Sequence, residues 1–179
     1  SEITAVAAKA MPSVVTIEVA GDTGAGSGSG VVIDERGYVM TNAHVVSIGA
    51  QEPLVRVTMS DGRLFEAEVV GRDVLSDIAV IKIADEGPFT VMAMGDSNRL
   101  NVGDQTIAIG APLGLPGTVT SGIVSAINRS ITVGASQVPG EEDGQFDFDL
   151  PGGSPMVGTT ISLPVIQTDA SINPGNSGG

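Results

Sequence analysis

Short apolar runs separated by turn residues make up most of the sequence. The runs are rich in Val, Ile and Thr, and several of them alternate apolar with polar positions. Alternation with a period of two is typical of β-strands that bury one face. We therefore predict strands over the runs 13–20, 30–34, 37–41, 53–60, 63–70, 77–83, 105–110, 118–127 and 164–168.

Two local signals refine this pattern. Residues 1–10 are rich in alanine, with Ser1 as a suitable N-cap and Pro12 as a stop, so they predict a short N-terminal helix. The dipeptide Asp61-Gly62 lies between two predicted strands and is typical of a tight hairpin. Many short strands at this spacing indicate an all-β barrel or sandwich.

The predicted strands fall into two groups. The stretch 85–100 has a weaker pattern, and a new strand-like run begins after Val102-Gly103. We expect two sub-barrels, one in a first domain over 1–98 and one in a second domain over 99–179.

Two segments differ from the rest of the chain. Residues 21–30 (GDTGAGSGSG) are predicted to be a loop that connects two strands. Residues 133–163 form a long predicted insertion whose centre, 141–149 (EEDGQFDFD), is acidic. A loop of this length is usually either functional or disordered, and both interpretations are open.

Composition and charge exclude several functions. Of the 179 residues 41% are hydrophobic but only 3% aromatic, so we expect a core of aliphatic side chains. The net charge of −13 argues against a nucleic-acid partner, because phosphate binding needs clustered Lys and Arg. The chain has no Cys and a single His, His44, which excludes thiol chemistry and metal sites built from several His. We expect no metal and no cofactor.

Three motifs carry candidate chemistry, and each also has a structural interpretation. Ser177 lies in Gly175-Asn176-Ser177-Gly178-Gly179, which is either a nucleophile on a tight turn or an ordinary Gly-Ser loop. His44 follows a predicted strand, and its imidazole is either a base for a Ser hydroxyl or a structural group. Asp77 precedes an apolar strand, where it either orients the base or caps its own turn.

The three motifs occur in the order His, Asp, Ser, which is the order of the chymotrypsin-type arrangement. With SVVTIEV, GSGSGVVID, VGDQTIAIGAPLGLPGTVTSGIVSAINR and VIQTDASINPGNSGG, they make the chain resemble the HtrA/Deg branch of the trypsin-like serine proteases. The resemblance covers nearly the whole chain except 133–163. It implies an all-β, two-barrel fold with a short N-terminal helix and, in this chain, an incomplete second barrel.

The resemblance also implies residue roles. Ser177 is the expected nucleophile, His44 the general base and Asp77 the residue that orients it. The N–H groups of Gly175 and Ser177 form the expected oxyanion hole. One wall of the specificity pocket is expected from Ser171, Ile172 and Asn173, and Ile172 favours small aliphatic residues before the scissile bond.

The expected substrates are unfolded, damaged or extended polypeptides. The resemblance further implies a homotrimer, a C-terminal PDZ domain outside this chain, and a periplasmic, secreted or cell-surface location, with any membrane anchor in a segment outside it. The insertion 133–163 occupies the position at which proteases of this family carry a regulatory loop. A chain ending at Gly179 is expected to be inactive alone.

Two alternatives stay open. The first is a catalytically silent protein of the same fold that binds extended peptides at a sheet edge. The second is an acidic surface that binds cations, which rests only on 141–149 and does not match the EF-hand spacing.

Overall fold

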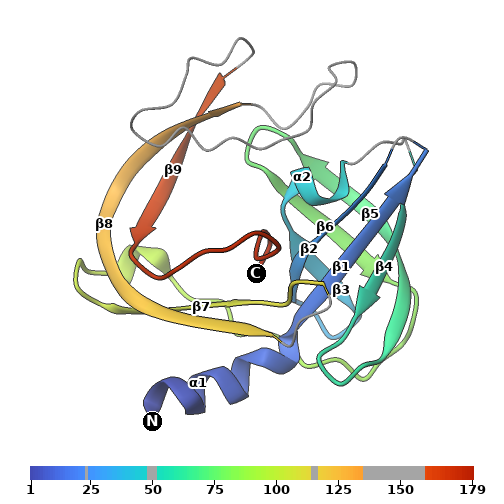
Figure 1. The fold of residues 1–179 in the computed structure, drawn as a ribbon, viewed down its shortest axis with the longest axis horizontal. Helices are drawn as coiled ribbons and strands as arrows, with labels where there is room; N and C mark the ends of the chain where they lie inside the picture. Colours follow the sequence, from blue (N-terminus) through green and yellow to red (C-terminus); the bar gives the residue numbers. More distant parts are fainter. Residues whose placement is uncertain (23, 48–51, 114–116, 135–159) are drawn as a thin grey trace.

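The computed structural model describes residues 1–22, 24–47, 52–113, 117–134 and 160–179. A six-stranded barrel lies beside a curved three-stranded sheet (Figure 1). The helical elements are α1 (Glu2–Ala10), η1 (Met11–Ser13), α2 (Ala43–Val46) and η2 (Ser97–Arg99). The strands are β1 (Val14–Gly21), β2 (Gly24–Val32), β3 (Tyr38–Thr41), β4 (Leu54–Thr58), β5 (Leu64–Asp73), β6 (Ile78–Ile83), β7 (Gln105–Gly110), β8 (Thr118–Gly134) and β9 (Thr160–Thr168).

The barrel is closed in the order β1-β2-β3-β6-β5-β4, with neighbouring strands antiparallel. Alternate residues of its strands point inward, as Val15, Ile17 and Val19 of β1 do, and all three are buried. The buried core is aliphatic, as the composition predicts, and Phe65 and Phe89 pack only at its margin. Closure removes the free sheet edges that an open six-stranded sheet would expose.

Strand β2 corrects the prediction of a loop over 21–30. Residues 24–30 belong to β2 and pair with β1 from Val14↔Val31 to Gly21↔Gly24. At Gly30 neighbouring side chains occupy the space of a side chain: a Cβ there would come within 2.6 Å of Val39 and 2.7 Å of Ile17. Here glycine marks close approach within a strand rather than a loop.

Over the described residues, the second half of the chain forms the three-stranded sheet β7-β8-β9, which does not close into a barrel, and the resemblance implies an incomplete second barrel here. Strand β8 runs to Gly134, beyond the predicted end at 127, and β9 begins at Thr160 rather than 164. Shifts of register around Ala126 and a positive φ at Asn128 interrupt the alternation there, which explains the short prediction. The ends of the predicted insertion 133–163 are therefore paired strands, while its acidic centre at 141–149 lies outside the described residues.

The N-terminal helix and the hairpins follow their sequence signals. The Ser1 hydroxyl accepts the N–H of Thr4, as an N-cap does, and α1 ends at Ala10, where η1 with Pro12 as its second residue follows. Gly62 has a φ of +89° in the hairpin between β4 and β5, as predicted from Asp61-Gly62. Over the described residues, no helix has the length and apolar character needed to cross a membrane.

Candidate active site

His44 lies on α2, the single helical turn that follows β3. Its neighbours Ala43, Val45 and Val46 are buried in the barrel core and fix the position of the turn. The imidazole itself lies at the barrel rim, with 21% of its side chain exposed. His44 therefore follows a strand, as predicted, and α2 holds its ring partly exposed, where a reactant can approach.

Asp77 lies in the turn just before β6, and its carboxylate is directed at His44. One oxygen, Oδ1, accepts the backbone N–H of His44 at 2.9 Å, and Oδ2 lies 2.8 Å from the ring Nδ1. The carbonyl oxygen of Asp77 accepts the N–H of Ala43 at 3.2 Å and the side-chain amide of Asn42 at 2.9 Å. Asp77 is buried and has a φ of +56°, an uncommon conformation for a residue other than glycine. The structure therefore joins the two predicted residues through side chain and backbone.

Ser177 lies on the second of two consecutive tight turns. In the first, the N–H of Asn176 bonds the carbonyl of Asn173 at 3.1 Å, and in the second the N–H of Gly179 bonds the carbonyl of Asn176 at 2.9 Å. Gly175 and Gly178 each have a φ of +91°, as the third position of a type II turn requires. We call residues 173–179, which carry the predicted nucleophile Ser177, the nucleophile turn.

The nucleophile turn lies against the barrel, although it follows β9 in the chain (Figure 1). The N–H of Ser29 donates to the carbonyl of Ser177 at 2.7 Å. A Cβ on Gly28 would come within 2.7 Å of Val45 and 3.0 Å of the Ser177 carbonyl oxygen, so Gly28 lies between these two residues. Since Val45 follows His44 on α2, the turn carrying Ser177 contacts the barrel beside the helix that carries His44.

The residues predicted to line the specificity pocket connect β9 to the nucleophile turn. The carbonyl of Ser171 accepts the Thr120 hydroxyl at 2.7 Å, and the side chain of Ile172 is largely exposed. The carboxylate of Asp169, which precedes these residues, accepts the backbone N–H of Ile123 on β8 at 2.8 Å.

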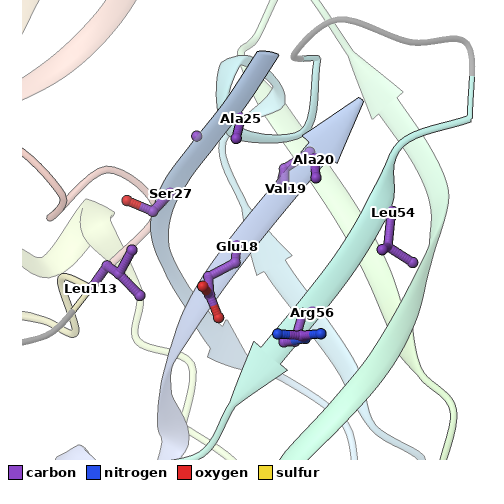
Figure 2. Close-up of a pocket in the computed structure, with 9 residues that line it drawn as sticks. Glu18, Val19, Ala20, Ala25, Ser27, Leu54, Arg56 and Leu113 are labelled. Carbon is purple, nitrogen blue, oxygen red and sulfur yellow. The ribbon is translucent and has the colours of Figure 1, made fainter. Parts of the chain in front are cut away.

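A surface pocket of about 430 Å³ lies on the outside of the barrel, over β1, β2 and β4 (Figure 2). Leu113 borders it on the side of Ser27, and Leu54 and Arg56 border it on the side of β4, with Glu18 between them. None of the candidate catalytic residues lines it. Its lining residue Ser27 directly precedes Gly28 on β2, but no residue of the nucleophile turn lines the pocket.

Three polar residues around the nucleophile turn were not predicted from the sequence. The Ser29 hydroxyl donates to the carbonyl of Gly175, the Thr118 hydroxyl donates to the side-chain oxygen of Asn176 at 3.0 Å, and the Thr41 hydroxyl donates to the carbonyl of Ser29. The only signal for Ser29 was a serine between glycines directly before an apolar run. Within the described ranges, no group of three His, Asp or Glu residues is close enough to hold a metal ion.

Comparison with known proteins identifies relatives of this chain. The model of the trypsin-like peptidase domain matches residues 28–179. The serine protease PepD of Mycobacterium tuberculosis is 42% identical over 97% of this chain and 35% of its own length. The periplasmic serine endoprotease DegP of Escherichia coli is 46% identical over 85% of this chain and 26% of its own length.

A solved HtrA-type protease with a bound tripeptide is similar to this structure with a TM-score of 0.73 and 34% sequence identity. The match covers 99% of this chain and 49% of that one. The chain thus spans about a third or less of the two curated relatives and about half of the solved one. The family model, the identities and the shared fold agree: the chain belongs to the trypsin-like peptidase family, in its HtrA branch.

Proposed function

We propose that this chain is the peptidase domain of a serine endopeptidase that uses Ser177, His44 and Asp77. The observation that carries the proposal is the double contact of Asp77 with His44. An ionised carboxylate only accepts hydrogen bonds, so Oδ2 at 2.8 Å requires Nδ1 to donate. The neutral ring then has its lone pair on Nε2, which is the tautomer that can take a proton from a serine hydroxyl.

In the proposed reaction the Ser177 Oγ attacks the carbonyl carbon of the scissile peptide bond, and His44 takes the hydroxyl proton. The imidazolium then gives that proton to the leaving amine, and Asp77 stabilises the positive ring in both steps. Water attacks the acyl-enzyme by the same route and releases the acid. The N–H groups of Gly175 and Ser177 bind the developing oxyanion, and loss of one such donor typically lowers turnover about 10²–10³-fold.

We propose extended or unfolded polypeptides as substrates, in a role in protein quality control. A peptide that binds by strand addition is recognised through its backbone, which a folded substrate does not expose. The exposed Ile172 supports a preference for small aliphatic residues before the scissile bond. A periplasmic or secreted location is proposed because relatives such as DegP are named periplasmic. The homotrimer and the PDZ domain remain proposals for the full-length protein.

The test compares Ser177→Ala with Ser60→Ala in the full-length protein. Ser60 is an exposed serine in the hairpin between β4 and β5, so its loss controls for a general effect of removing a hydroxyl. We expect Ser177→Ala to abolish both hydrolysis of a peptide library and labelling by a fluorophosphonate, and Ser60→Ala to leave both unchanged. Labelling that persists in Ser177→Ala would reject Ser177 as the nucleophile. A folded wild-type protein without labelling would favour the silent peptide-binding alternative.

A further inference from the structure

Ser29 is a fully buried polar residue of β2 that contacts both halves of the molecule. Its hydroxyl donates to the carbonyl of Gly175 at 2.9 Å and accepts the N–H of Ala111 at 2.8 Å. Its backbone N–H donates to the carbonyl of Ser177 at 2.7 Å. Its carbonyl accepts the hydroxyl of Thr41 at 2.7 Å. One side chain and its backbone therefore connect the barrel, the segment after β7 and the nucleophile turn.

Ser29 donates hydrogen bonds to two carbonyl groups that lie on either side of the Ser177 N–H in the nucleophile turn. They belong to the peptide units between residues 175 and 176 and between 177 and 178. The peptide unit between these two carries the N–H of Ser177, which is one of the proposed oxyanion donors. Because a peptide unit is planar, fixing the units on both sides restricts the direction in which this N–H points.

The carbonyl of Ser29 connects the nucleophile turn to the side of the site that carries the base. Thr41, which donates to it, is the last residue of β3 and lies three residues before His44. A Cβ on Gly178 would overlap both the Ser29 carbonyl oxygen and the Thr41 hydroxyl, so the turn is packed directly against this pair. A shift of Ser29 would therefore displace both the nucleophile turn and the end of β3.

We infer that Ser29 is a positioning residue, which sets the nucleophile turn and its oxyanion donors against the barrel. The inference rests on the proposed function, because it assigns Ser29 a role in the same reaction. A hydroxyl is suited to the position because it donates and accepts at once, and so satisfies the Gly175 carbonyl and the Ala111 N–H together. Alanine would leave both groups without this partner in a buried environment.

If Ser29 had a purely structural role, it would only join the barrel to the second half of the chain through Ala111. The chain contains a matched control for this role. The hydroxyl of Thr16, on β1, donates to the carbonyl of the same Ala111 at 2.7 Å. It bridges the same two parts of the molecule as Ser29. The bond from Thr16 ends at Ala111, whereas Ser29 also bonds Gly175 and Ser177.

The experiment compares Ser29→Ala with Thr16→Val in the full-length protein. For Ser29→Ala we expect kcat to fall by about 10-fold or more with KM changed less than about twofold, because misaligned donors weaken binding of the transition state and not of the substrate. A peptide aldehyde, which forms an oxyanion, should lose affinity by a similar factor. Amide hydrogen exchange over 173–179 should be faster in Ser29→Ala only. Thr16→Val should leave kcat and exchange close to the wild type.

Equal values of kcat and equal exchange in the two variants would overturn the inference, as would a rise in KM at constant kcat in Ser29→Ala. If Ser29→Ala does not fold, Ser29→Cys replaces it and is judged by the same criteria, because a thiol has similar size but is a weak donor. The proposed function is tested separately by Ser177→Ala. If wild-type labelling does not depend on Ser177, that proposal fails, while hydrogen exchange still decides whether Ser29 holds the turn.

Discussion

At the scale of single residues, Asp77 is more deeply buried than His44, the residue that it contacts. Its carboxylate is buried, and each oxygen contacts a different part of His44, the backbone N–H and the ring. A charge can be buried at such a position because both oxygens are hydrogen-bonded. The ring is therefore oriented relative to its own backbone by a single side chain.

Asp77→Asn tests this arrangement with almost no change in size. The amide can donate to Nδ1, which places the proton of the ring on Nε2 and removes its ability to act as a base. We expect kcat to fall by about 10⁴-fold at neutral pH, the loss typical of this exchange in a serine triad. Peptide hydrolysis measures the effect, and circular dichroism checks the fold.

The control for this prediction is Asp73→Asn. The Asp73 carboxylate caps the same turn by accepting the Leu75 N–H and the Ser76 hydroxyl. These bonds hold the pKa of Asp73 below its usual value, the Ser76 hydroxyl contributing most. Loss of the negative charge in this turn without loss of the contact to His44 should leave kcat within a few-fold. Equal losses of kcat in the two variants would show that the turn, not the Asp77 carboxylate, is what matters.

The sequence allowed His44, Asp77 and Ser177 to be selected, since each stands in a distinctive local motif and their order is informative. Ser29 could not be selected in this way. Its partner Gly175 is 146 residues away, and nothing in a run of alternating Gly and Ser shows which serine is buried. Long-range hydrogen bonds of this kind are set by how the two halves pack, which no local pattern encodes.

At the scale of elements, residues 24–29 show how part of a strand can lack the usual strand signals, although the end of the same strand β2 was predicted from the run 30–34. Strand propensity is largely a matter of side chains that fit a half-buried surface. In β2 the neighbouring strands supply the side chains, and the glycines leave room for them. The pattern of hydrophobic and polar positions therefore predicted the apolar strands β1, β4 and β6 well. It failed in the first part of β2, where side chains of neighbouring residues take the place of the strand's own.

Gly30→Ala tests this explanation against Gly71→Ala, a glycine on β5 of the same barrel. A Cβ on Gly30 would clash with Val39 and Ile17, whereas one on Gly71 meets nothing within 4 Å. Overpacking of a core costs about 1–3 kcal/mol, so we expect Gly30→Ala to be destabilised by that amount and Gly71→Ala to be close to neutral. Urea denaturation gives both values. A neutral Gly30→Ala would mean that β2 accommodates side chains there, and that its glycines have another cause.

At the scale of the whole molecule, the site is assembled from distant parts of the chain. His44 and Asp77 come from the closed barrel, and the nucleophile turn follows the last strand of the sheet and returns to the barrel (Figure 1). Its contacts with the barrel include hydrogen bonds to Ser29 and close packing at Gly178 and against Gly28. Assembly of the site therefore depends on how well the turn fits the barrel surface.

Gly178→Ala tests this dependence, with Gly103→Ala as its control. Both glycines have φ above +90°, where an L-residue is strained by about 1–2 kcal/mol, so backbone strain alone should cost the two variants a similar amount of stability. Only at Gly178 would the new Cβ overlap the barrel, at the Ser29 carbonyl, while at Gly103 it meets nothing within 4 Å. We therefore expect fluorophosphonate labelling to fall by about 10²-fold or more in Gly178→Ala and to persist in Gly103→Ala, because the displaced turn no longer aligns its donors. Equal labelling in the two variants would mean that close packing of the turn on the barrel is not required to assemble the site.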